Sequence, residues 1–131
     1  MKDFKPALNW IESQKQTMID LVARWSNMNT HTFNVKGLTE MVNDLEQYLA
    51  IFKENIQEIA LPAFEWVNPE GKIERAELAP LLMVSKRAHL PRQALFLIHM
   101  DTVYPMHDDF QQTILTDSKT LTGPGVADAG G

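Results

Sequence analysis

Three residues with metal-binding side chains stand where apolar segments of the chain turn polar. His99 and Asp101 follow the apolar run at residues 94–98, and Asp128 follows a break at Gly123-Pro124-Gly125. Imidazole and carboxylate groups are the ligands that zinc accepts besides thiolates. In His99-Met100-Asp101 the first and third side chains of an extended segment point to the same side, so Asp101 is placed to hold a ring nitrogen of His99. The pattern predicts a hydrolytic metal site.

Taken singly, each of these residues also has a plain structural explanation. A histidine at the end of a strand is commonly a hydrogen-bonded structural residue, and an aspartate in a glycine loop is commonly a turn residue. The nearby cluster of His107, Asp108 and Asp109 is interpreted as a solvated loop, because nothing in the pattern fixes its geometry.

Composition narrows the classes of protein that this chain can represent. Its 131 residues, 44% of them hydrophobic, are enough for one domain with a core. The formal net charge of −5, without a basic cluster, argues against nucleic acid as a partner. Because cysteine is absent, any metal must be bound by His, Asp or Glu. The N-terminus has no signal-peptide pattern and no apolar run approaches the roughly 20 residues that cross a bilayer, so we expect a cytoplasmic protein without membrane contact.

Periodicity predicts helices first and strands later. We expect a helix over residues 6–27, broken near Ser13, where Ser13-Gln14-Lys15-Gln16 has the form of a capping box. Asn34 is expected to cap a helix whose apolar stripe runs from Leu38 to Phe52. Strands are predicted at 64–67, at 81–84, as a buried strand at 94–98, and less clearly at 113–115 and 120–121, with a turn at 68–71. This order favours a layered α/β fold.

The strings HMDTVYP after the apolar run and GPGVAD further along the chain resemble the signatures of the M20 family of zinc-dependent metallohydrolases. That family includes glutamate carboxypeptidases, acetylornithine deacetylases and succinyl-diaminopimelate desuccinylases, and the match looks most like the first branch. The resemblance implies that residues 1–131 form the N-terminal portion of a catalytic domain, an incomplete three-layer α/β/α sandwich. It implies two zinc ions, with His99 as a ligand, Asp101 orienting that histidine in a catalytic role, and Asp128 bridging the metals. The implied substrate is a small peptide or N-acyl amino acid whose terminal amide bond is hydrolysed.

The sequence also departs from the family pattern. The Glu-Glu segment that carries the general base and further ligands would lie beyond Gly131, and the expected lysine is missing from Asp128-Ala129-Gly130-Gly131. We therefore expect weak metal binding and no amide hydrolysis by the isolated chain. We also expect an exposed sheet edge that favours association, such as homo-oligomer formation.

Two alternatives stay open at this point. The chain could be a catalytically inactive remnant that acts as a binding or association module. It could also be a nucleotide-binding α/β domain that uses residues 123–131 as a phosphate loop, although neither of the usual glycine-rich phosphate motifs is present.

Overall fold

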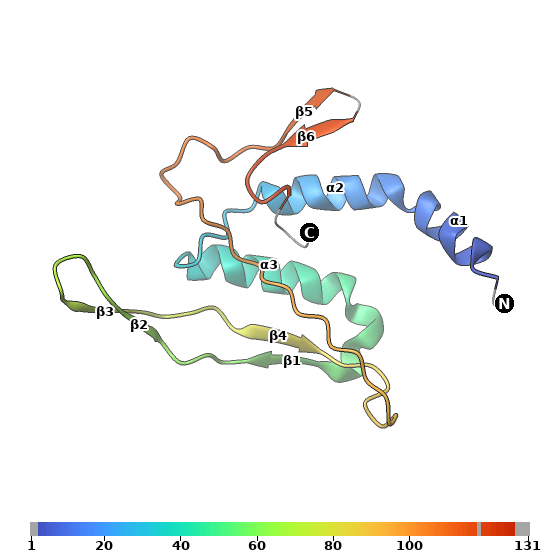
Figure 1. Ribbon diagram of the computed structural model, residues 1–131, viewed down its shortest axis with the longest axis horizontal. Coiled ribbons are helices and arrows are strands. Elements are labelled where there is room, and N and C mark those ends of the chain that lie inside the picture. The colour runs from blue at the N-terminus through green and yellow to red at the C-terminus, as the bar shows by residue number, and fades with distance from the viewer. Residues whose placement is uncertain (1–2, 118, 128–131) are drawn as a thin grey trace.

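The computed structural model describes residues 3–117 and 119–127 as a mixed α/β arrangement, with helices first and short strands after them (Figure 1). The elements in chain order are α1 (Lys5–Ser13), α2 (Lys15–Ser26), α3 (Val35–Tyr48), the 3-10 segment η1 (Ala50–Asn55), β1 (Ile56–Ile59), β2 (Phe64–Val67), β3 (Ile73–Ala76), β4 (Leu81–Val84), β5 (Ile114–Asp117) and β6 (Thr120–Thr122).

The first two helices confirm the predicted break near Ser13, although the capping box is wrong. Gln14 separates α1 from α2, and its side chain makes no capping bond to α2. The Ser13 hydroxyl instead donates to the carbonyl oxygen of Trp10 at 2.6 Å, because a serine at the end of a helix can bond back into the preceding turn. The break therefore reflects the way α1 ends at Ser13 and not a side-chain cap at the start of α2.

The third helix begins as predicted and carries the core. The Asn34 side chain accepts a hydrogen bond from the Gly37 backbone N–H at 3.2 Å, which satisfies one of the unpaired donors at the helix start. Leu38, Met41 and Val42 on the apolar stripe are buried. The helix ends at Tyr48, so the predicted last member of the stripe, Phe52, lies in η1 instead.

A polar cluster joins the end of α2 to the middle of α3. Arg24 forms an ion pair with Asp44, and the indole Nε1 of Trp25 donates to the same carboxylate oxygen at 2.7 Å. The Tyr48 ring lies edge-on to Trp25, with the centroids 5.9 Å apart, and 5.1 Å from the Arg24 guanidinium carbon. The hydrogen bonds from Arg24 and then Trp25 lower the pKa of Asp44 below its ordinary value.

Within the described residues, the strands form three separate two-stranded antiparallel sheets, in the pairs β1–β4, β2–β3 and β5–β6. In β2–β3 the register pairs Phe64 with Ala76 and Val67 with Ile73. The predicted turn between them is confirmed: the Gly71 N–H donates to the Asn68 carbonyl at 2.9 Å, and Gly71 has a positive φ of 76°. The strands predicted at 64–67 and 81–84 are confirmed, and the two uncertain ones correspond to β5 and β6.

The prediction of a buried strand at residues 94–98 is wrong. The run lies between β4 and β5 as an irregular segment without ladder hydrogen bonds, drawn as a plain coil in Figure 1. Leu95, Phe96, Leu97 and Ile98 are 80%, 90%, 82% and 68% exposed. Its sequence has the apolarity of an interior strand, yet none of the described segments pairs with its edges or covers its faces.

None of the described helices is long and apolar enough to cross a membrane.

Candidate metal site

His99 and Asp101 lie together, as the sequence predicts. The Nδ1 atom of His99 is 2.9 Å from the carbonyl oxygen of Asp101 and 3.2 Å from its carboxylate Oδ1. A carbonyl and an ionised carboxylate can only accept, so Nδ1 is the donor and carries the hydrogen. In the neutral ring the lone pair then belongs to Nε2. The His99 side chain is 56% exposed, so the imidazole is within reach of solvent and of ions.

Asp101 is itself held from the other side by the loop before α3. The Thr32 hydroxyl donates to Asp101 Oδ2 at 2.5 Å, so the two carboxylate oxygens have different partners. The next residue, Thr102, donates its backbone N–H to the Thr30 carbonyl at 2.9 Å and forms an isolated parallel bridge with His31. Thr30 and Thr102 are both buried. The orientation of His99 thus depends on a chain of bonds that begins in the buried corner beside α3.

Asn29 fixes the loop that follows the site. Its side-chain Nδ2 lies within hydrogen-bond distance of the Tyr104 carbonyl, at 3.0 Å, and of Gln111 Oε1, at 2.8 Å. Gln111 donates in turn to the Pro105 carbonyl at 2.8 Å. The segment at residues 101–111 therefore has a defined path although it contains no regular element.

The third predicted ligand, Asp128, lies outside the described residues. The glycine loop before it is described as far as Ala127: Pro124 and Gly125 are buried, and Gly125 has a φ of 69°, which favours glycine. A Cβ added to Gly123 would lie 2.9 Å from the Cα of Thr113, so this position also needs a small residue. The loop bends at its glycines. That Asp128 joins His99 in one site remains a prediction from the sequence.

The described residues meet only part of the requirement for a zinc site. Histidine fixed by a carboxylate through its second nitrogen is the usual arrangement of a zinc ligand, and His99 with Asp101 fits it. Across residues 3–117 and 119–127, however, no three His, Asp or Glu side chains are grouped so that they could hold a metal ion. His107 is exposed in the loop, in agreement with its interpretation as solvated, and Asp108 accepts from the Phe110 N–H at 2.8 Å.

Thr32 and Asn29 are the supporting residues that the sequence interpretation missed. Both belong to the polar stretch at 27–32, which is predicted only as a loop. Thr32 is 69 positions from Asp101, and Asn29 is 75 positions from Tyr104. Local periodicity in the sequence therefore cannot predict these contacts. The only local signal is the density of Asn and Thr, whose short polar side chains often bond to nearby backbone and side-chain groups.

The acidic groups with shifted pKa values lie elsewhere. Besides Asp44, the pKa of Asp117 is lowered, mainly because its carboxylate accepts the backbone N–H of Lys119 at 2.7 Å. Both shifts have local causes in an ion pair or a turn, so they do not mark a catalytic acid or base.

Comparisons of the chain with protein-family models, curated proteins and solved structures found no match.

Proposed function

We propose that this chain is the N-terminal portion of the catalytic domain of a cytoplasmic, zinc-dependent amidohydrolase of the M20 type, built as a three-layer α/β/α sandwich. The observation that carries the proposal is the pairing of His99 Nδ1 with the Asp101 carboxylate at 3.2 Å. It is supported by the order of the HMDTVYP and GPGVAD strings along the sequence. The proposed substrate is a small peptide or an N-acyl amino acid.

Within this proposal the residues have separate roles. His99 would bind one zinc ion through Nε2, and Asp101 would fix the ring and increase the electron density on that nitrogen. Asp128 would bridge two zinc ions. When bound, the zinc pair supplies Lewis acidity toward an amide carbonyl and lowers the pKa of a bound water. Thr32 positions Asp101 through its 2.5 Å hydrogen bond.

The proposal assigns only part of the active site to these 131 residues. A catalytic zinc ion ordinarily takes three protein ligands plus water, and the described residues group fewer than three. We therefore expect weak zinc binding and no hydrolysis by the isolated chain. Zinc-dependent amide turnover by the purified chain, lost in His99→Ala, would contradict this expectation.

Calorimetric titration with zinc tests the site directly. We expect His99→Ala to abolish the saturable zinc signal and Asp101→Ala to weaken it by about 10–100-fold, the usual cost of losing the partner of a metal-binding histidine. His107→Ala is the matched control, because His107 is an exposed histidine on the same loop. Equal zinc binding by the wild-type chain and His99→Ala would reject the proposed site.

A second function, association through an exposed apolar segment, is favoured by the run at 94–98. Its four large side chains are 68–90% exposed and would form an apolar surface on the order of 500 Å², the size at which such patches mark interaction sites. No charged residue interrupts the run. We propose a second copy of the chain as the partner, paired antiparallel about Phe96, because this register places Leu95 against Leu97 across a two-fold axis.

Light scattering coupled to size-exclusion chromatography distinguishes a dimer formed through this run from a monomer. We expect a dimer that becomes a monomer in Phe96→Asp, where the charge would be buried at the two-fold axis. Ile73→Asp is the control, since Ile73 is 74% exposed on β3 and distant in sequence. A monomeric wild-type chain, or a dimer unaffected by Phe96→Asp, would reject pairing through this run.

A further inference from the structure

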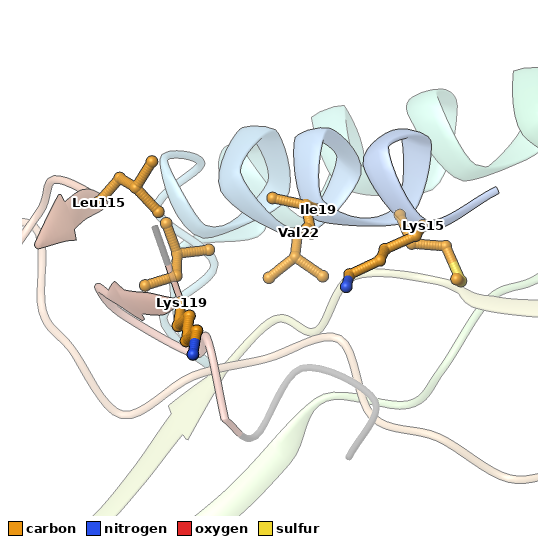
Figure 2. Close-up of a pocket in the computed structure, with 7 residues that line it drawn as sticks. Lys15, Ile19, Val22, Leu115 and Lys119 are labelled. Carbon is orange, nitrogen blue, oxygen red and sulfur yellow. The ribbon is translucent and has the colours of Figure 1, made fainter. Parts of the chain in front are cut away.

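An apolar groove separates α2 from the β5–β6 hairpin (Figure 2). Its volume is about 370 Å³, within the range of small-ligand pockets. The walls are apolar side chains from both elements: Met18, Ile19 and Val22 on α2, Leu115 on β5 and Leu121 on β6. None of these residues belongs to the candidate metal site, so the groove is a separate feature of the molecule.

The position of the two walls is set by hydrogen bonds at one end of the groove. Thr113, just before β5, donates its backbone N–H to Asn27 Oδ1 at 2.7 Å, and its hydroxyl donates to the Ala23 carbonyl at 3.4 Å. These bonds join the start of the hairpin to the C-terminal end of α2. The two walls are therefore joined by hydrogen bonds at this end of the groove.

Two lysines line the same groove, one on each wall. Lys15 begins α2 and Lys119 lies at the turn of the hairpin. Figure 2 shows both nitrogens on the same side of the groove, with Ile19 and Val22 between them in that view. Neither ammonium group forms an ion pair with a described residue, in contrast to Lys36, which lies 3.9 Å from Glu40.

Two acidic residues close in sequence to these lysines accept hydrogen bonds from groups other than the ammonium groups. The Asp117 carboxylate accepts the backbone N–H of Lys119 at 2.7 Å, and Asp20 accepts from the Gln16 side chain at 2.9 Å. An apolar floor with two cations at its edge is complementary to a ligand with an aliphatic body and an anionic end. A neutral ligand would leave the ammonium groups unused, and a small inorganic anion would leave the apolar walls exposed.

We propose that the groove binds an aliphatic carboxylate, with the hydrocarbon chain against Ile19, Val22 and Leu115 and the carboxylate between Lys15 and Lys119. This inference does not depend on the proposed hydrolase function, because it uses different residues and no metal. The expected contribution of each lysine is modest, since both ammonium groups are at the surface.

A titration of the methyl-labelled chain with decanoate, below its micelle concentration, tests the proposal by NMR. We expect saturable shifts of the Met18, Ile19, Val22, Leu115 and Leu121 methyl signals, and none at Ile73. The double variant Lys15→Gln/Lys119→Gln should weaken decanoate binding by about tenfold, since each exposed ion pair contributes a few-fold. The matched control is Lys36→Gln on α3, which should leave the affinity unchanged.

Decan-1-ol separates the two parts of the recognition. We expect decanol to bind more weakly than decanoate to the wild-type chain and equally to wild type and the double variant. Leu115→Asn, at a side chain that is 62% exposed, should weaken both ligands. Absence of saturable shifts with decanoate, or equal decanoate affinity in the wild type and the lysine double variant, would overturn the proposal.

Discussion

Two apolar stretches of this chain have opposite fates. On α3, Leu38 is 6% exposed and Val42 is fully buried, whereas in the run at 94–98 Phe96 is 90% exposed and Leu97 82%. Both stretches are rich in large aliphatic residues. The α3 stripe finds partners within the described residues, and the 94–98 run does not. An apolar stretch of sequence therefore indicates that its side chains favour burial. Whether they are buried depends on segments far along the chain, or on a partner, that can pack against them.

The sharpest test of this comparison is a pair of truncations to alanine. We expect Leu38→Ala to lower the free energy of unfolding by about 3 kcal/mol, because it removes buried methyl groups and leaves a cavity. In the Phe96→Asp chain, where the proposed pairing of two copies is absent, Leu97→Ala should change it by less than about 0.5 kcal/mol, as for other exposed positions. Urea denaturation followed by circular dichroism measures both. A larger loss for Leu97→Ala would mean that the run is covered in the folded chain in solution.

A second test concerns the close contact at the start of α3. A Cβ added to Gly37 would lie 1.9 Å from the Asn29 carbonyl oxygen and 2.6 Å from the Asn34 side-chain nitrogen. We expect Gly37→Ala to destabilise the chain by about 2 kcal/mol, the usual cost of overpacking, although alanine is the better helix former. Gly71→Ala is not a matched control, because Gly71 has a positive φ.

The appropriate control is Lys36→Ala, one position earlier on the exposed side of α3. We expect this change to alter stability by less than about 0.5 kcal/mol. Equal stability of wild type and Gly37→Ala would contradict the close packing of the 29–34 loop on α3.

Local sequence signals predicted the parts of the fold that depend on near neighbours. The Asn34 cap, the break between α1 and α2, and the Gly71 turn all involve contacts within a few residues, and each is confirmed. The 94–98 strand is wrong because a strand needs an edge supplied by another segment. Hydrophobicity alone cannot reveal whether that segment is present.

In the candidate site too, the contact between near neighbours in sequence was predicted and the contact between distant residues was not. The His99–Asp101 contact spans two positions, so the alternation of side chains predicts it. The hydrogen bond from Thr32 to Asp101 joins residues 69 positions apart, so no periodicity in the sequence predicts it. Whether Asp128 joins these residues remains a prediction, because it lies outside the described part of the chain.

The polar junction of α2 and α3 offers a pH-dependent test. The native pKa of Asp44 is lowered by its bonds to Arg24 and Trp25, so the native state prefers the ionised form more than the unfolded state does. This contribution is complete above the unfolded pKa of about 4 and is lost as the pH falls through the native value. We expect Asp44→Asn to cost about 1 kcal/mol at pH 7, because Arg24 is half-exposed.

Urea denaturation followed by Trp fluorescence at several pH values measures the difference between wild type and Asp44→Asn. The gap should close as the pH falls below about 4, since protonated Asp44 no longer attracts Arg24. A gap that is constant from pH 7 to pH 3 would show that the carboxylate charge does not stabilise the junction.

Thr32 links the loop before α3 to the candidate site. Thr32→Val removes the hydroxyl that donates to Asp101 and keeps the branched shape of the side chain. We expect a loss of about 1 kcal/mol in unfolding free energy and a several-fold weaker response to zinc, because Asp101 would be less well fixed. Thr39→Val, which removes a hydroxyl bonded within α3, is the matched control and should leave the zinc response unchanged. An unchanged zinc response in Thr32→Val would show that the loop before α3 does not position Asp101 for zinc binding.

The most direct test of the proposed metal site is the protonation and zinc response of the His99 ring, observed by long-range proton–nitrogen NMR. The contacts with Asp101 predict that Nδ1 carries the hydrogen in the neutral ring and that zinc shifts the Nε2 signal of His99, with no comparable change at His107. Hydrogen on Nε2 in the metal-free neutral ring, or a zinc response at other histidines and none at His99, would contradict the account.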